Sequence, residues 1–378
     1  MSASPASAPR AARPARGQAA AGARALRERA LCHLSMGMLG EARSDAGEAL
    51  ALVERELGPA DPEAAGALLV LWRIAAASGD PPAAEAHARR AVLALARARR
   101  GGEIKRLRVH AWLALAATAR LQGRYADAAA RARRALRLAE AAFGTRDVEV
   151  AACLNELAMS CKYRARFAEG ARLYRRAIRV LERAHGPDHP DLAPLLHNLG
   201  GLEHARGRAA RGEPFARRSV ALREAALGPE HPLVAEDAAA LAAILDAQGK
   251  RSEAAALYRR ALAIFERAYG PAHHEVAFTT SNLAALLCAE GELDAAARLF
   301  RKAIGTMEGL LGPTHPDLAM ALNNLGVLRL RQGRRASARR LLERALSIYM
   351  ATLGPGHPTT AACRENLAEA GPAGSIVA

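Results

Sequence analysis

The chain has 378 residues, a formal net charge of +16 and a sequence pI near 10.6; 51% of its residues are hydrophobic and only 4% are aromatic. No apolar run approaches the roughly 20 residues that a membrane-spanning helix requires, so helical membrane spans are excluded. Abundant alanine with few aromatic residues favours a helical chain.

Residues 1–21 consist mainly of Ala, Ser, Pro, Arg and Gly and contain no acidic residue. This composition predicts a disordered basic tail, because too few apolar side chains are present to form a core. The segment has no apolar central region and is therefore not a secretory signal. An acid-free start with Arg and Ser is also typical of an organelle transit peptide, and this alternative stays open.

From residue 22 onward a period of 42 residues dominates the sequence. Two sets of glycines follow this step: Gly144, Gly186, Gly228, Gly270, Gly312 and Gly354, and separately Gly207, Gly249, Gly291 and Gly333. The first set opens a recurring phrase, Gly-Pro-x-His-Pro, as at residues 312–316. A fixed period of this length is typical of repeat architectures, in which each unit packs only on its neighbours.

Residues 313–354 show what one unit contains. Pro316 suits the first turn of a helix, and leucines then recur at helical spacing until Gly333, which can adopt the left-handed conformation that ends a helix. A second apolar helix follows and ends at Gly354. The unit is therefore a helix, a tight turn and a second helix, and its short loops predict antiparallel neighbours.

Aligned copies of the unit reveal three columns of residues. In the first helix a leucine precedes a small residue, as in Leu283-Ala284 and Leu325-Gly326. A column early in the second helix is small throughout: Ala42, Ala84, Ala128, Gly170, Gly212, Ala254, Ala296 and Ala338. Four residues later the column is often large: Tyr174, Tyr258, Phe300 and Leu342. Small residues let two helix backbones approach closely, and the large residues are predicted to fill the space between units.

These columns, with a further alanine such as Ala303 or Ala345 in the second helix, resemble the tetratricopeptide repeat. The period is longer than the usual 34 residues of that family, and the Gly-Pro-x-His-Pro loop is similar to that of the kinesin light chain and nephrocystin-3 type. The resemblance covers about residues 25–370. It implies an all-α, right-handed α-solenoid whose first helices line a concave groove.

We therefore predict about eight helix-turn-helix units and a C-terminal capping helix. The predicted ranges are 22–58, 59–100, 101–144, 145–186, 187–228, 229–270, 271–312 and 313–354 for the units and 356–370 for the capping helix, within a solenoid over 22–370. Residues 371–378 are predicted to be frayed. Trp72 occupies the small-residue position of the second unit, and an Arg-Arg-Gly-Gly segment replaces the loop that should follow, so we expect altered packing and a small hinge at 99–105.

The groove is the first candidate for a binding site. The resemblance places the two residues before each leucine–small pair on the inner wall, where asparagine recurs, and it implies a ladder of amides that holds a peptide backbone. The predicted groove residues are Asn155, Glu156, Lys162, His197, Asn198, Ser281, Asn282, Asn323, Asn324 and Arg331. The alternative is that the asparagines form hydrogen bonds between the helices of the solenoid itself.

The second candidate is a basic face. All but four of the 54 Lys and Arg residues are arginine, and pairs of them occupy one position of successive second helices. The predicted members are Arg175, Arg176, Arg217, Arg218, Arg259 and Arg260. Stacked, they could bind phosphates or an anionic surface. The alternative is a solvated face, because the chain has few aromatic residues for base stacking and no known nucleic-acid module.

No pattern indicates catalysis, a metal or a cofactor. The five cysteines are scattered and form no C-x-x-C motif, which favours a reducing compartment, the cytoplasm. One histidine recurs per unit: His189, His231, His273, His315 and His357. Neighbouring copies are about one helix-pair width apart, too far to share a metal ion, so we predict that each shapes its loop and caps the next helix. No nucleophile–base arrangement, phosphate loop or dinucleotide fingerprint appears, and we predict no enzyme.

Together these features predict a non-catalytic scaffold or adaptor that binds a partner peptide or helix in the groove. The basic balance predicts acidic segments in that partner, and nucleic acid is a less favoured partner. The alternatives are a binder of nucleic acid or an anionic surface through the arginine face, and a regulatory sensor that closes around a small ligand or peptide. The partner and the oligomeric state are left open.

Overall fold

The computed structural model describes residues 12–96, 98 and 101–371, within which there are 17 α-helices, one short 3₁₀ helix and no strand. The α-helices are α1 (Ala12–Ser35), α2 (Leu39–Glu56), α3 (Pro62–Ala77), α4 (Pro81–Ala96), α5 (Gly102–Leu121), α6 (Tyr125–Phe143), α7 (Val148–Tyr163), α8 (Phe167–His185), α9 (Ala193–Ala205), α10 (Ala209–Leu227), α11 (Pro232–Asp246), α12 (Arg251–Tyr269), α13 (His274–Glu290), α14 (Leu293–Leu311), α15 (Pro316–Arg331), α16 (Arg335–Thr352) and α17 (Pro358–Glu369). The 3₁₀ helix, η1 (Pro190–Leu192), directly precedes α9. The predicted all-α class is confirmed.

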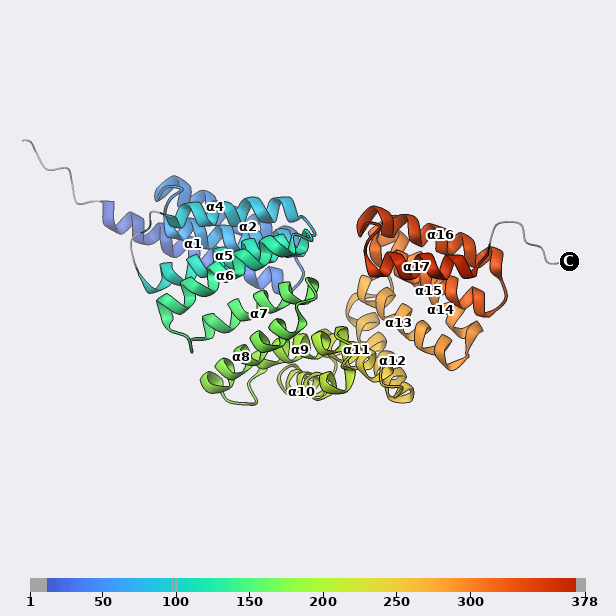
Figure 1. Cartoon of the computed structure of the whole chain (residues 1–378). Helices are drawn as coiled ribbons and strands as arrows, with labels where there is room; N and C mark the ends of the chain where they lie inside the picture. Colours follow the sequence, from blue (N-terminus) through green and yellow to red (C-terminus); the bar gives the residue numbers. More distant parts are fainter. Residues whose placement is uncertain (1–11, 97, 99–100, 372–378) are drawn as a thin grey trace, which may run out of the picture. The chain divides into compact units, whose positions relative to one another are not determined.

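Consecutive helices form antiparallel pairs, from α1 with α2 to α15 with α16, and α17 packs against the last pair (Figure 1). The described residues divide into two compact units, residues 1–198 and 199–378, and the boundary falls within α9. Eight helix pairs followed by one single helix confirm the predicted α-solenoid with a capping helix.

The large residues of the second helices lie in the cores of these units. Tyr174 belongs to the first unit, and Tyr258, Phe300 and Leu342 belong to the second; none of the four is more than 3% exposed. Each is surrounded by the small and branched residues of adjoining helices, as expected for a side chain that fills the space between repeats. Their predicted role is confirmed.

The tight turn inside each pair uses the left-handed backbone conformation. Gly333 has φ 72° between α15 and α16, as its place after a helix end predicts. The fourth repeat has Ala165 at this position, and it adopts the same conformation with φ 55°. An L-residue there costs about 1–2 kcal/mol, so the packing of α7 on α8 outweighs a local strain.

The loop between pairs ends in a histidine that caps the next helix. The Nδ1 atom of His231 accepts a hydrogen bond from the amide of Leu233 at 3.1 Å, and His315 accepts from the amide of Asp317 at 3.2 Å. His189, His273 and His357 accept in the same way from residues two positions on. The predicted capping role of this histidine is therefore confirmed.

Two helix backbones come closest at a pair of glycines from the predicted small columns. A Cβ atom built on Gly212 in α10 would lie 2.7 Å from the carbonyl oxygen of Gly200 in α9. Gly326 in α15 is similarly crowded, because a Cβ there would lie 2.7 Å from Cγ of Leu342. A small residue is required at Gly212 because α9 and α10 touch through their main chains, and at Gly326 because the Leu342 side chain packs directly on the backbone of α15.

The start of the chain differs from the prediction. The segment 12–21 was predicted to be disordered, but α1 begins at Ala12. Arg24 forms a hydrogen bond to Glu63 of α3 at 2.7 Å, and Arg16 lies 3.9 Å from Asp61, which fixes α1 on the second pair. The predicted tail residues 1–11 and the frayed residues 372–378 lie outside the described residues.

The prediction of a hinge also changes. Residues 102–105, assigned to that hinge, form the first turn of α5, while residues 99 and 100 lie outside the described part. Pro214 is the sixth residue of α10. Pro194 explains why α9 is preceded by a 3₁₀ turn, because it has no N–H to complete an α-helical hydrogen bond there.

Candidate binding groove

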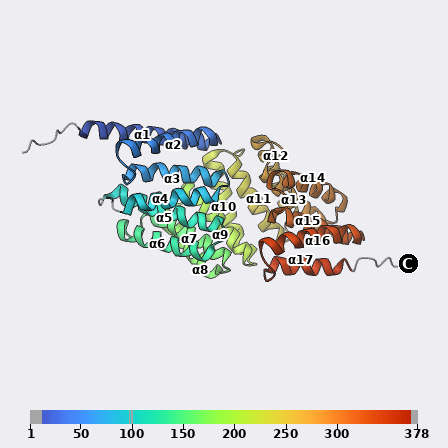
Figure 2. The ribbon, with the colours of Figure 1, turned by 90° about the horizontal axis from the view of Figure 1, so that it is seen from above.

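The first helices of successive repeats form one continuous layer in each unit. Cα atoms of α3 and α5, and of α5 and α7, approach within 8 Å in the first unit, whose helices follow one another in chain order from α1 to α8 in Figure 2. The same holds for α11, α13 and α15 in the second unit. No second helix of the described residues contacts the next second helix in this way, so the first-helix layer is the tighter and therefore inner side.

The inner layer of the first unit contains a cleft of about 310 Å³. Its lining comes only from α3, α5 and α7: Leu69, Trp72, Arg73, His110, Leu113, Ala114, Ala117, Ala152, Asn155 and Glu156. Six of these ten residues are apolar. Asn155 and Glu156 were predicted groove residues, and the structure brings them to the same cleft.

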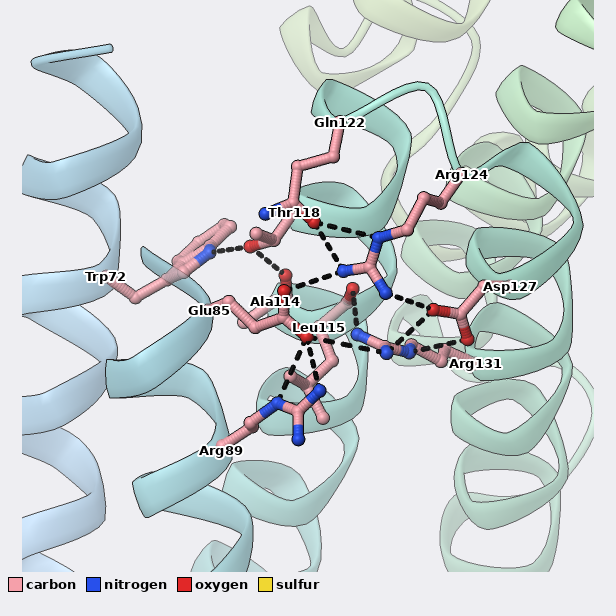
Figure 3. A network of polar contacts seen from close by, with 10 residues as sticks. All are labelled: Trp72, Glu85, Arg89, Ala114, Leu115, Thr118, Gln122, Arg124, Asp127 and Arg131. Carbon is pink, nitrogen blue, oxygen red and sulfur yellow. Dashed lines mark hydrogen bonds and ion pairs between the residues drawn. The ribbon is translucent and has the colours of Figure 1, made fainter. Parts of the chain in front are cut away.

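Trp72 forms one side of this cleft in a fixed orientation. Its indole N–H donates to Oγ1 of Thr118 at 2.9 Å, and that hydroxyl donates to the carbonyl of Ala114 at 2.8 Å (Figure 3). Thr118 is fully buried, so the chain of bonds connects the ring to the helix backbone of α5. The altered packing expected at Trp72 is thus an indole that lines a cleft between repeats.

The charged residues in and beside the cleft differ in whether an oppositely charged partner lies nearby. Glu156 is 8% exposed and accepts from Nε of Arg120 at 2.9 Å; burial raises the pKa of this carboxyl group. His110 lies 2.8 Å from Glu149, which also accepts from Arg106. Arg73 is exposed and has no ion pair with any described residue, so it is available to an anionic group in the cleft.

The predicted asparagine ladder is partly used inside the protein. Asn198 donates to Oδ1 of Asn155 at 3.1 Å, and Asn366 donates to Oδ1 of Asn323 at 3.0 Å. Each bond joins residues 43 positions apart, from one first helix to the next. Asn324 accepts from Asn323 at 3.4 Å, whereas the amide of Asn282 has no partner among the described residues. Both original interpretations therefore have support: some amides connect repeats and others keep free hydrogen-bonding groups.

The remaining predicted groove residues differ in accessibility. Lys162 is half-buried and without a partner within the described ranges, and burial lowers its pKa. His197 is half-buried as well, and Arg331 is exposed and donates to the carbonyl of Cys288 at 3.0 Å. Ser281 is only 1% exposed, so its predicted place on the groove wall is wrong: it packs between helices and cannot present its hydroxyl to a ligand.

Arg73 and His110 are cleft residues that the sequence analysis missed. The two residues before the leucine–small pair of the third repeat are Leu113 and Ala114, and both line the cleft. If the two residues before the leucine–small pair had also been taken in the second and third repeats, this side of the cleft would have been predicted.

The predicted arginine face is largely neutralised by the neighbouring repeats. Arg176 pairs with Glu140 at 2.5 Å and Arg260 with Glu224 at 2.6 Å, each 36 positions earlier in the preceding second helix. Arg217 lies 2.9 Å from Glu213 and 2.7 Å from Glu253. Arg175 and Arg218 also have interaction partners, while Arg259 is exposed and has no ion pair with the described residues.

On the inner layer of the second unit, an imidazole links two repeats. Nε2 of His274 lies 3.0 Å from Oδ2 of Asp317, and Nδ1 lies 3.6 Å from Glu275. Hydrogen bonds to Asp317 and then to Glu275 raise the pKa of His274 to about 9. The same bond lowers the pKa of Asp317.

We expect His274→Gln to lower the melting temperature by a few degrees near pH 6 and by much less near pH 10. An unfolded histidine titrates near pH 6.5, so the contribution is complete below that value and is lost as the pH rises to about 9. The partial exposure of the pair keeps the effect modest. Thermal melts of both chains at the two pH values measure it; an equal loss at both would contradict the assignment.

The stacked antiparallel helix pairs, with their inner layer of first helices, define an α-solenoid repeat protein. A family model described as tetratricopeptide repeat matches residues 107–183, 154–211, 191–267, 253–308, 275–351 and 317–370. These matches span more than half of the chain, and the chain belongs to the tetratricopeptide repeat family. No curated protein matches it.

Several solved structures share the fold. BtubC (BKLC) from P. vanneervenii is 25% identical, with 62% of this chain and 93% of that chain covered and a TM-score of 0.50. A Rap protein complexed with competence and sporulation factor is 12% identical, with 93% and 98% covered and a TM-score of 0.56. A signal transduction ATPase with numerous domains and a tetratricopeptide repeat sensor, from Pyrococcus horikoshii, is 12% identical, with 92% and 50% covered and a TM-score of 0.60.

In the part of the chain that the structure describes, no three His, Cys, Asp or Glu side chains are placed to hold a metal ion. None of the helices in the same ranges combines the length and apolar character needed to cross a membrane.

Proposed function

We propose that the protein is a non-catalytic interaction scaffold and that the first-unit cleft binds a segment of a partner protein. The single observation that carries this proposal is the cleft of about 310 Å³ on the inner layer, with a fixed tryptophan and an unpaired arginine beside it. A preformed apolar recess with few polar groups is the usual form of a binding site. Membership of the tetratricopeptide repeat family supports the same use.

The chemistry of the cleft defines the segment it would accept. Leu69, Trp72 and Leu113 offer a recess for one apolar side chain, and a pre-oriented indole suits a binding anchor because little side-chain entropy is lost. Arg73 would pair with a carboxylate next to that side chain. The net charge of +16 would steer acidic segments toward the surface.

The first helices of the second unit would bind a peptide segment through backbone contacts. Asn282 and Asn324 lie half-buried on α13 and α15, and Arg331 is exposed at the end of α15. The free hydrogen-bonding groups of these amides can bond a peptide backbone whatever its sequence. We also propose a cytoplasmic location, which rests on the cysteine usage alone.

The test is a selection of random peptides displayed on phage against the full chain, followed by affinity measurement of the selected peptides in solution. We expect them to be acidic with one large apolar residue, and Trp72→Ala and Arg73→Glu to weaken binding at least tenfold. Trp112→Ala and Arg172→Glu are matched controls, because neither residue lines the cleft. Equal losses in the variants and their controls would reject the cleft as the site.

The alternative of a nucleic-acid or anionic-surface binder has weaker support. Ion pairs with neighbouring carboxylates neutralise Arg176, Arg217 and Arg260, whose positive charges such a ligand would need. This alternative predicts a steep loss of affinity with salt and no effect of Trp72→Ala. A regulatory sensor that closes around its ligand would use the same cleft, and only a ligand-dependent change in chain dimensions would distinguish it.

A further inference from the structure

In four repeats, a carboxylate occupies the position just before the small residue of the second helix. These residues are Glu41, Asp127, Glu169 and Glu253, and the last three form ion pairs in the structure. Glu169 lies 2.8 Å from Arg166, which precedes its own helix, and accepts a hydrogen bond at 3.4 Å from Arg133 in the second helix of the preceding repeat. One carboxylate therefore bridges two guanidinium groups.

Asp127 and Glu253 each have one of these two kinds of partner. Asp127 lies 2.9 Å from Arg124, which again precedes the helix, and 2.7 Å from Arg131 (Figure 3). Glu253 lies 2.7 Å from Arg217, which stands 36 positions earlier, as Arg133 does for Glu169. At Glu169 the two arginines thus form a cationic slot that an acidic side chain fills.

The eighth repeat has arginines at both basic positions but no acidic residue between them. Ser337 stands at the acidic position of α16, Arg334 precedes the helix as Arg166 does, and Arg301 is 36 positions earlier as Arg133 is. Arg301 and Arg334 are exposed, and neither forms an ion pair with a described residue. The one bond of the Arg301 side chain goes from Nε to the carbonyl of Ala297 at 3.2 Å, within its own helix.

A third guanidinium group contributes to this slot. Arg329, near the end of α15, donates to the side chain of Gln332 at 2.6 Å. Burial lowers the pKa of Arg329, and the positive charges of Arg334 and Arg301 lower it further. The acidic group that faces it is Asp294, which accepts from Nε2 of Gln332 at 3.2 Å.

We propose that Arg301, Arg334 and Ser337 form a binding site for a phosphate group. A phosphate dianion presents several acceptor oxygens, so it can bridge two guanidinium groups as Glu169 does and also accept from the Ser337 hydroxyl. The phosphate can be inorganic phosphate or a phosphomonoester in solution, or it can be carried on Ser337 itself. In the second case a serine kinase would transfer the γ-phosphoryl group of ATP: the Ser337 Oγ–P bond forms, the bond to ADP breaks, and the hydroxyl proton passes to the kinase's base.

Thermal melting of the full chain in phosphate and in chloride, at matched pH and ionic strength, tests the site with inorganic phosphate as the probe. We expect phosphate to raise the melting temperature of the wild type by about 2 °C or more. Arg301→Gln and Arg334→Gln should abolish this rise. Arg259→Gln is the matched control, because Arg259 is also exposed and without an ion pair among the described residues but lies outside the slot.

Two further chains separate the sources of the phosphate. Ser337→Glu should melt above wild type in chloride and respond little to phosphate, since its carboxylate fills the slot. A basophilic serine kinase with ATP should add one phosphate to the wild type and none to Ser337→Ala, as measured by intact mass. Stabilisation by that modification without a response to inorganic phosphate assigns the covalent source, and the reverse assigns the free ligand. A wild type that melts equally in both salts, with Ser337→Glu and the kinase-treated chain no more stable, overturns the proposal.

Discussion

Replacing Gly212 with alanine is expected to destabilise the chain by about 1–3 kcal/mol, as overpacking at a close helix contact does. The added Cβ would lie 2.7 Å from the carbonyl oxygen of Gly200. A backbone atom cannot swing away as a flexible side chain can, so α9 and α10 would have to separate. Urea unfolding followed by far-UV circular dichroism measures the change.

The matched control is Gly305→Ala in α14, because a Cβ there meets nothing within 4 Å. Glycine weakens a helix interior by roughly 0.5–1 kcal/mol relative to alanine, so this substitution should stabilise the chain. The same chemical change is thus expected to have opposite signs at two positions. A stabilised Gly212→Ala chain would show that the two helices do not touch through their backbones.

Arg223→Ala is expected to have the largest effect of any single substitution named for this protein, about 3–5 kcal/mol of lost stability. Nε of Arg223 lies 2.7 Å from Oδ2 of Asp237, whose side chain is 1% exposed. Ser219 donates to the same oxygen at 2.6 Å. Truncating the arginine removes one partner of a buried ion pair while the carboxylate stays buried, which is the costly way to break such a pair.

Two variants test that reasoning. The double variant Arg223→Ala, Asp237→Asn should recover part of the loss, because the buried charge is then removed as well. Arg251→Ala breaks an exposed pair with Asp246 at 3.8 Å and should cost no more than about 1 kcal/mol. If Arg223→Ala destabilises the chain no more than Arg251→Ala, the pair does not have the buried character that the structure gives it.

The repeat architecture could be predicted because each packing requirement recurs along the sequence. A small residue such as Ala296 or Ala338 marks every close helix contact, and His315 is one of five equivalent caps. An isolated histidine would have left a metal ligand and a helix cap equally open. Because the histidine recurs once per loop, at a spacing too wide for a shared metal ion, the sequence favours the helix cap.

The binding groove could be predicted only in part, because side-chain partners depend on how far successive repeats are offset. Asn198 lies in line with Asn282 by repeat position, but it bonds Asn155, which is one position out of register. The ion pairs of the arginine face have the same origin, since Glu140 and Arg176 occupy different columns of the alignment. The sequence showed that Trp72 replaces the small residue of the repeat pattern, but it could not show the hydrogen bond between Trp72 and Thr118.

The cross-repeat contacts are short in sequence terms: Arg176 and Glu140 are 36 positions apart, and Asn155 and Asn198 are 43 apart. Such a chain has low contact order, and folding can begin at any repeat and spread to the next without closing a long loop. The same locality bears on evolution. An in-phase tandem duplication or deletion of 42 residues would leave partners of this kind at their old separation. The protein can therefore gain or lose groove length by whole repeats while the chemistry of the remaining wall stays unchanged.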